Sequence, residues 1–198
     1  MKSLVGTQTR ENLLKSFAGE SQARNRYVFF AAAAEEEGYI QISRIFRETA
    51  DNEEQHARRF YNFLVEGLKD ELPTAVEIKN AGYPVAKGTT LDNLKAGAAG
   101  EKEEAEQLYP AFAQTAREEG FPEIAAAYLK IADVEKRHEA RYNKLTGNVA
   151  NGKVFQKDQP VQWICLKCGY VHTGTTPPKV CPACLHPQAY FELFVENY

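Results

Sequence analysis

The sequence has little cysteine, little net charge and no long apolar run, and each absence excludes a class of protein. No stretch is long enough and apolar enough to span a membrane, and the start, Met1 to Gly6, lacks the apolar core of a signal peptide. The net charge is only -3, so the chain shows no basic footprint for nucleic acid. No cysteine precedes Cys165, and the cysteines form two C-x-x-C pairs, which in a cytosolic chain indicate metal ligation rather than disulfides. We therefore expect a cytoplasmic protein that binds neither membrane nor nucleic acid.

One motif occurs twice in the first three quarters of the chain. The pattern A-D-x-E-x-x-H-x-x-R-aromatic runs from Ala50 to Phe60 and again from Ala132 to Tyr142. Residues three apart lie on one face of a helix about one turn apart, so each copy can place a glutamate and a histidine on one metal ion. Helix bundles that bind two irons or two manganeses use this motif twice, and each of the other two helices adds a glutamate.

The additional glutamates occur in a second repeat. The triplet Ala18-Gly19-Glu20 recurs as Ala99-Gly100-Glu101, an offset of 81 residues (18 to 99), whereas the E-x-x-H copies are 82 residues apart (53 to 135). A single E-x-x-H arises by chance in helices this charged, but two copies in register with two triplets form a strong signal. The sequence therefore predicts a duplicated helical hairpin, each half carrying a glutamate and then an E-x-x-H.

Apolar spacing predicts four helices, at about residues 7–38, 39–67, 90–119 and 122–146. Pro110 lies inside the third predicted helix, where it removes a backbone hydrogen bond and should cause a kink. Residues 69–88 break the helical pattern with two prolines and two glycines. One long crossover of this kind is typical of ferritin-like bundles.

Seven ionisable side chains fall on the apolar faces of these helices: Glu20, Glu53, His56, Glu101, Glu104, Glu135 and His138. Five buried carboxylates without a cation would be strongly destabilising, and a carboxylate and imidazole donor set suits iron or manganese. The alternative is a set of solvated ion pairs, such as Glu20 with Arg24 or Arg26, but it conflicts with the apolar position of these groups. Asp51 and Asp133 are also repeated, yet they lie roughly 200° around the helix from the glutamates and are expected to face outward.

The composition changes after a polar linker at residues 148–160, which separates a helical domain, 1–147, from a small domain, 161–198. The small domain contains four cysteines that define a tetrahedral sulfur site: Cys165, Cys168, Cys181 and Cys184. A piece this short needs its metal to fold, and the cysteines alone leave a zinc ribbon and an Fe(Cys)4 centre equally open. Zinc does no redox chemistry. A di-iron site that reduces a substrate must be resupplied with electrons, so the presence of both sites favours iron.

The whole chain resembles the rubrerythrins, in which a ferritin-like di-iron bundle precedes a rubredoxin-like domain. The resemblance rests on Ala18 to Tyr27, on both E-x-x-H helices, on Gly100-Glu101 followed by Glu104, and on the C-x-x-C-G-Y and C-P-x-C motifs. It implies a mainly α fold with two iron ions on the seven carboxylate and histidine ligands. It also implies a third iron on the cysteines, and tyrosines beside the ligands at Tyr27 and Tyr109.

The resemblance further implies a peroxidase that reduces hydrogen peroxide to water in defence against oxidative stress. Electrons would come from NAD(P)H through an external donor, a reductase or a rubredoxin-type protein, and would pass through the Fe(Cys)4 centre. Members of this family pair head to tail and some exchange helices, so we expect a homodimer or larger homo-oligomer. Two other functions stay open. One is a protein that oxidises and stores iron, which the presence of an electron-carrying Fe(Cys)4 centre disfavours. The other is a non-catalytic helical bundle with a structural zinc site.

Glu104 has no partner in the first helix, and the charge of the site indicates a role for it. Five carboxylates against two Fe³⁺ leave one positive charge, whereas against two Fe²⁺ they leave one negative charge, which is costly in a low-dielectric core. The family is described as exchanging a carboxylate for a histidine on reduction. We hypothesise that Glu104 leaves and His56 arrives, which restores neutrality.

Overall fold

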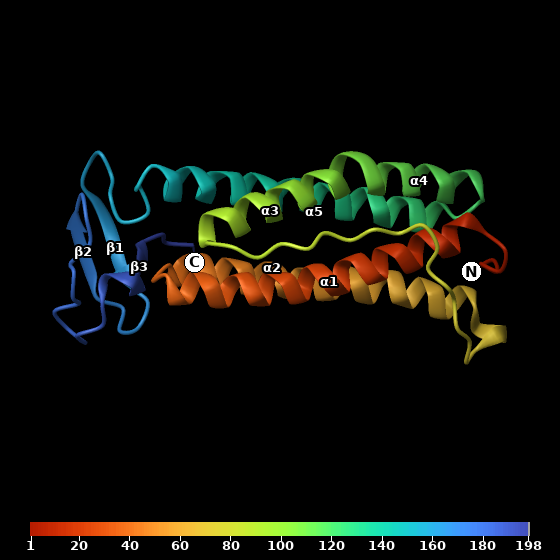
Figure 1. Ribbon diagram of the computed structural model, residues 1–198, viewed down its shortest axis with the longest axis horizontal. Coiled ribbons are helices and arrows are strands. Elements are labelled where there is room, and N and C mark those ends of the chain that lie inside the picture. Colours follow the sequence, from red (N-terminus) through yellow and green to blue (C-terminus); the bar gives the residue numbers. More distant parts are fainter. Residues whose placement is uncertain (198) are drawn as a thin grey trace.

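The computed structural model describes residues 1–197 and shows a long helical bundle with a small sheet at one end (Figure 1). This arrangement confirms the predicted mainly α fold followed by a small β and loop region. The helical elements are α1 (Gln8–Glu36), α2 (Ile40–Gly67), the short 3-10 turn η1 (Lys69–Glu71), α3 (Thr90–Glu103), the π-helix η2 (Glu104–Leu108), α4 (Tyr109–Glu118) and α5 (Pro122–Ala150).

The helix ends follow local sequence chemistry. The Thr7 side chain accepts a hydrogen bond from the backbone N–H of Arg10 at 3.2 Å and caps α1, and Gly38 ends that helix with a φ of +81°. Thr89 and Asp92 form a capping box at the start of α3. Helix α5 continues to Ala150, so residues 148–150, which the sequence placed in the linker, are helical.

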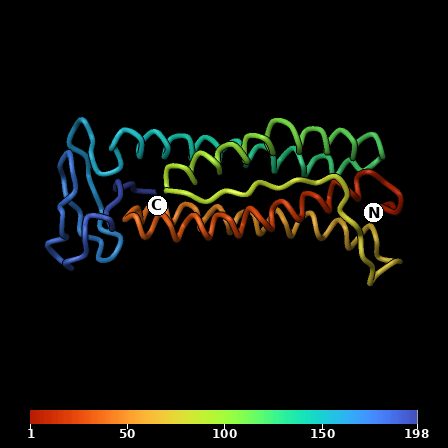
Figure 2. Tube along the Cα trace, viewed as in Figure 1, coloured from red at the N-terminus to blue at the C-terminus, as the bar shows by residue number. Residues whose placement is uncertain are grey.

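The bundle consists of two helical hairpins joined by the crossover. Helix α1 packs along α2, and α3 with α4 packs along α5. The crossover, residues 72–89, returns along the length of the bundle beside α1, so that α3 begins at the end where α2 began (Figure 2). This path places equivalent residues of the two hairpins at the same level of the bundle.

The third predicted helix consists of α3, η2 and α4, so it is not a single α-helix, and the kink at Pro110 stays a prediction. The backbone widens into the π-helix η2 just before Pro110, and the N–H of Tyr109 donates to the carbonyl of Glu104 instead of a residue four positions back. A π-helix holds an additional residue within a helical stretch. That residue accounts for the change in repeat offset from 81 at Glu101 to 82 at Tyr109, whose counterpart is Tyr27.

Two apolar clusters fill the bundle, one on each side of the ionisable residues. One cluster is built around Phe60, Tyr109 and Tyr128, and the other around Phe46 and Tyr142. On each helix the glutamate ligand candidate lies between the two clusters in sequence. The apolar clusters therefore close the site from both ends of the bundle.

The small domain is a three-stranded antiparallel sheet in the order β2-β1-β3. Its elements are β1 (Val161–Cys165), β2 (Val171–Gly174), the 3-10 turn η3 (Gln188–Tyr190) and β3 (Phe191–Leu193). Trp163 and Phe191 form its buried core with two of the cysteines. The domain contacts the end of the bundle where α1 meets α2 through an ion pair of Arg44 with Glu192 at 3.5 Å, and Phe155 of the linker stacks on Tyr39 at the same end. Among residues 1–197, none of the helices has both the length and the apolar character that crossing a membrane requires.

Candidate metal centres

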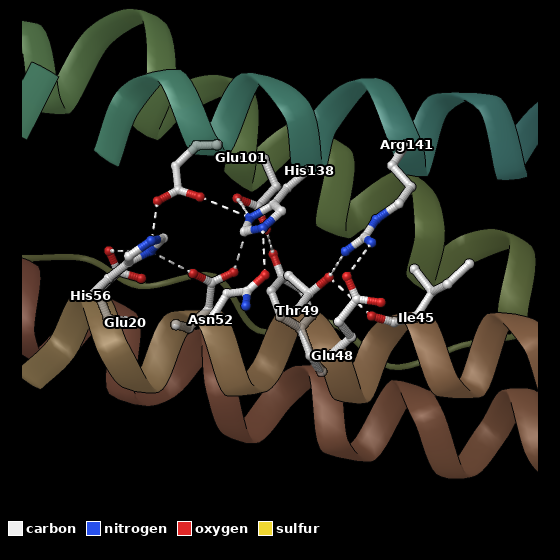
Figure 3. Close-up of polar contacts among 12 residues, drawn as sticks. Glu20, Ile45, Glu48, Thr49, Asn52, His56, Glu101, His138 and Arg141 are labelled. Atoms are coloured by element: carbon white, nitrogen blue, oxygen red, sulfur yellow. Dashed lines mark hydrogen bonds and ion pairs between the residues drawn. The ribbon is translucent and has the colours of Figure 1, made fainter. Parts of the chain in front are cut away.

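Six of the seven predicted ligands meet in the centre of the bundle (Figure 3). They form two groups of four, each with its ligand atoms within 4.8 Å of one another. The first group is Glu20, Glu53, His56 and Glu135. The second group is Glu53, Glu101, Glu135 and His138.

Glu53 and Glu135 belong to both groups because each turns one carboxylate oxygen to each histidine. His56 Nδ1 lies 2.9 Å from Glu53 Oε2 and 3.0 Å from Glu135 Oε1. His138 Nδ1 lies 3.3 Å from Glu53 Oε1 and 2.8 Å from Glu135 Oε2. The two carboxylates are thus placed to bridge two cations, and Glu20 and Glu101 each serve one of them.

The buried donor atoms are directed at two centres rather than at hydrogen-bond partners. Eight of the thirteen buried side-chain polar atoms that lack a hydrogen bond within residues 1–197 belong to these six ligands. The four glutamates are at most 1% exposed. Buried carboxylates without hydrogen bonds are very costly unless a cation binds them. The donor set, oxygen with imidazole nitrogen and no sulfur, therefore fits two iron or manganese ions.

The pKa directions show how strongly the cluster attracts positive charge. Burial raises the pKa of Glu101 to about 8, and the neighbouring Glu53 adds to the shift. Burial by itself lowers the pKa of His56, but the carboxylates of Glu135 and Glu53 outweigh it and raise that pKa to about 10. The same competition raises the pKa of His138 to about 12. In the metal-free protein the cluster therefore binds protons at the positions that the two cations would occupy.

Two tyrosines donate hydrogen bonds to two of the glutamates in a crosswise pattern. The hydroxyl of Tyr27, on α1, donates to Glu101 of α3, and the hydroxyl of Tyr109, on α4, donates to Glu20 of α1. Burial, and then nearby carboxylates, raise the pKa of both phenols well above the usual range, so both remain hydrogen-bond donors. Their positions agree with those expected from the resemblance.

Asn52 is a residue of the site that the sequence did not reveal. Its Oδ1 lies 3.2 Å from His138 Nε2, so it holds the outer nitrogen of a histidine whose Nδ1 faces the metal position (Figure 3). The equivalent residue in the other repeat, 82 positions on, is Val134, which has no polar atom to offer His56. The only sequence signal for this contact is that the two repeats differ at this position, with Asn52 in one and Val134 in the other.

Glu104 lies beside the cluster but outside both ligand groups. It is partly exposed at the start of η2, and its Oε1 would lie 3.9 Å from a Cβ placed on Gly19. Burial of the carboxyl and the charge of Glu101 raise its pKa well above the usual range. The assignment of Glu104 as a seventh ligand stays a prediction.

The four cysteines form a separate group in the small domain. The Sγ atoms of Cys165 and Cys184 are 3.7 Å apart, as are those of Cys168 and Cys181. These separations exclude disulfides, and they match the edges, about 3.8 Å, of a sulfur tetrahedron with metal bonds of about 2.3 Å. Gly169 follows the first C-x-x-C pair with a φ of +77°, a conformation that suits glycine and turns the chain around the metal position.

Comparison with known proteins assigns both sites to one family. The sequence profile described as rubrerythrin matches residues 11–146, and the profile of the rubrerythrin rubredoxin-like domain matches residues 163–192. The chain belongs to the rubrerythrin family. It is 61% identical to rubrerythrin-1 of Clostridium acetobutylicum over 198 residues, and 48% identical to rubrerythrin of Nitratidesulfovibrio vulgaris over 198 residues, with 100% of each chain covered in both comparisons. The solved structure of partially reduced nigerythrin matches with a TM-score of 0.63 and 29% identity over 98% of this chain and 92% of that one.

Family membership gives the two clusters their metals. The carboxylate and histidine cluster is the di-iron site of a rubrerythrin, and the four cysteines are its rubredoxin-like iron site. Membership of this family implies iron cofactors at both sites and oxidoreductase activity.

Proposed function

We propose that this rubrerythrin is a peroxidase that reduces hydrogen peroxide to two waters at the carboxylate and histidine cluster. The observation that carries the proposal is the four-cysteine site in the same chain as a buried site for two irons. A site that oxidises Fe²⁺ takes its electrons from that iron, whereas a site that reduces a substrate needs electrons delivered in every cycle. The irons, when bound, supply the two electrons that the O–O bond takes up as it breaks.

The residues around the cluster are suited to supply and position the two protons. Burial raises the pKa of the Glu104 carboxyl, so it keeps a proton at a higher pH than an exposed glutamate does. A carboxylic acid beside the reacting oxygens can protonate the departing one, which is the ordinary work of a general acid. Tyr27 and Tyr109 remain protonated and hold Glu101 and Glu20 in place.

The position of Glu104 supports the proposed exchange with His56. Four carboxylates lie within the two ligand groups, and they balance the charge of two Fe²⁺. His56 lies within the first group and Glu104 outside it, which is the arrangement expected of the reduced site. Addition of Glu104 as a fifth carboxylate would favour two Fe³⁺.

The distance between the two sites within one chain favours exchange of electrons between copies. The small domain contacts the bundle at the start of α2, where Ala189 approaches Gly38. His56 lies sixteen residues beyond Ile40, which is about 24 Å along a helix axis. Because electron tunnelling falls exponentially with distance, we propose that the chain forms a head-to-tail homo-oligomer in which the cysteine site of one copy serves the cluster of another. An NAD(P)H-linked donor protein would reduce the cysteine site.

The test compares Glu104→Ala with the matched variant Glu101→Ala. Glu104→Ala should keep two irons in the cluster and its helical circular dichroism, should be easier to reduce, and should turn over peroxide more slowly. Glu101→Ala removes a member of the second group and should lose cluster iron. Stopped-flow mixing of the reduced parent with peroxide, and separately with O₂, measures the reaction directly. If the reduced parent does not react with peroxide, the proposed function is wrong.

If Glu104→Ala turns over peroxide as fast as the parent, Glu104 takes no part in the reaction. If the variant loses both irons, Glu104 is a permanent ligand and the exchange with His56 does not occur.

A further inference from the structure

A cavity of about 480 Å³ lies between α1, the π-helix η2 and the crossover, and the function proposed above does not explain its construction. Glu104, Tyr27 and Tyr109, which border the metal cluster, form its inner end. The crossover forms its outer wall through residues 80–84, and the Tyr83 hydroxyl anchors that wall by donating to the carbonyl of Lys15 at 3.1 Å. We call this space the access chamber.

Arg26 is a residue of the access chamber with one guanidinium nitrogen that lacks a protein partner. Its Nη1 is buried and has no hydrogen bond within residues 1–197. Arg24, two positions earlier on α1, pairs instead with Glu54 at 3.2 Å on another face of the helix. A buried guanidinium nitrogen without an acceptor is costly, so an unused donor on a residue that lines a cavity favours a ligand with an acceptor atom. Arg26 and Glu104 line the same chamber, and the charge of Arg26 partly offsets the rise in the pKa of Glu104, although no ion pair within 4.0 Å joins them in the described chain.

Two glycines leave space on the helical walls of the chamber. Gly19 and Gly100 directly precede ligands, and both line the chamber. A Cβ at Gly100 would meet nothing within 4 Å, and one at Gly19 would lie 3.6 Å from the Tyr83 ring. A long side chain at position 100 would therefore enter the chamber without displacing the backbone.

The chamber is larger than hydrogen peroxide requires, and part of its lining is apolar. Its volume falls in the range of pockets that bind organic ligands, roughly 300–1,000 Å³. Leu108, Phe112 and Pro84 provide apolar surface away from the polar inner end. The lining thus combines a donor, a carboxyl group and room for a small hydrocarbon group.

We propose that the access chamber binds hydroperoxides, small organic ones as well as hydrogen peroxide, and that Arg26 donates a hydrogen bond to the hydroperoxide group. The proposal rests on the peroxidase function and extends its substrate class. The reaction is ROOH plus two electrons and two protons giving ROH and water, in which the O–O bond breaks and the electrons come from the reduced cluster. Arg26 transfers no proton, because a guanidinium remains charged, and it serves only to orient the group and stabilise negative charge.

The experiment uses the full-length, iron-loaded protein and the variants Gly100→Leu and Arg26→Gln. Their matched controls are Gly147→Leu, on α5, where an added Cβ also meets nothing within 4 Å, and Arg24→Gln. One readout is kcat/KM for hydrogen peroxide, tert-butyl hydroperoxide and cumene hydroperoxide. A second readout, independent of turnover, is the dissociation constant of azide, a small linear anion, from a spectral titration. Iron content and circular dichroism verify that each variant is loaded and folded.

Gly100→Leu should lower kcat/KM for cumene hydroperoxide at least tenfold more than for hydrogen peroxide, and Arg26→Gln should weaken azide binding about tenfold, while the controls match the parent. If the parent reduces hydrogen peroxide but neither organic hydroperoxide, the extended substrate class is wrong. If Arg26→Gln binds azide and turns over peroxide like Arg24→Gln, the role of Arg26 is wrong. A parent that reduces no peroxide at all refutes the peroxidase function, and the azide titration then still decides whether Arg26 binds anions in the chamber.

Discussion

The contrast between Asn52 and Val134 predicts that the two histidine ligands are held unequally. Asn52 accepts a hydrogen bond from His138 Nε2 at 3.2 Å, whereas the same position in the other repeat is a valine. Asn52→Val makes the two repeats alike at this position. The variant should release the metal of the second group more readily, because His138 loses the contact that fixes its orientation and tautomer.

The expected loss of metal affinity follows from the usual effect of removing a hydrogen-bond partner of a metal-bound histidine. Loss of the outer partner of a metal-bound histidine typically weakens metal binding 10–100-fold, which is about 1.4–2.7 kcal/mol. Asn52 is partly exposed, and asparagine and valine have similar helix propensities, so the fold should change little. Val134→Asn is the converse variant. It offers His56 a partner and should slow any exchange of that histidine with Glu104, and hence turnover, without loss of metal.

The assay is metal retention against graded concentrations of a chelator, with peroxide turnover measured on the same samples. Asn52→Val should lose one of its two cluster irons at a lower chelator concentration than the parent, and Asn52→Gln, which can still accept the bond, should recover part of the loss. If Asn52→Val retains both irons as the parent does, or loses both together, the contact does not position His138. An unchanged turnover in Val134→Asn would show that the freedom of His56 is irrelevant to the reaction.

Three further predictions concern pH, the cysteine site and the tyrosines. In the metal-free protein the pKa of Glu101 is raised from 4.5 to about 8 and that of His56 from 6.5 to about 10, so both groups stabilise the fold at low pH and this stability is lost as the pH rises through the folded values. The melting temperature of the metal-free protein should therefore fall from pH 5 to pH 10. A melting temperature that does not change over this range would refute the linkage. Cys168→Ser should destroy the small metal site and stop steady-state turnover with an enzymatic donor, yet the artificially reduced cluster should still react once with peroxide; surviving turnover would disprove the electron relay. Tyr109→Phe leaves Glu20 without its buried donor and should lower the free energy of unfolding by about 1–3 kcal/mol while both irons remain bound, which denaturant unfolding and metal analysis would measure.

Much of the site could be predicted from the sequence because its ligands are repeated at helical spacing. Glutamate and histidine three residues apart share a helix face whatever the helix packs against, so Glu53 with His56, and Glu135 with His138, followed from local geometry alone. Cysteine spacing worked in the same way for the small domain, since each C-x-x-C pair is a local unit. The helix limits were close for the same reason, and the error at residues 148–150 arose because polar residues continue α5 into what looked like a linker.

The tertiary structure decided what depends on residues far apart in the chain. Asn52 reaches His138 across 86 positions, and nothing near Asn52 in the sequence announces that partner. The π-helix η2 appeared in the sequence only as a change of one in the repeat offset, and its backbone places Glu104 beside the cluster rather than in either ligand group. The access chamber exists because the crossover packs over α1 and η2, and a segment without regular periodicity carries no sequence signal for where it will lie. Side-chain periodicity defines which face of a helix is buried, but only the packing of separate segments defines which residues across the bundle meet and which spaces remain between them.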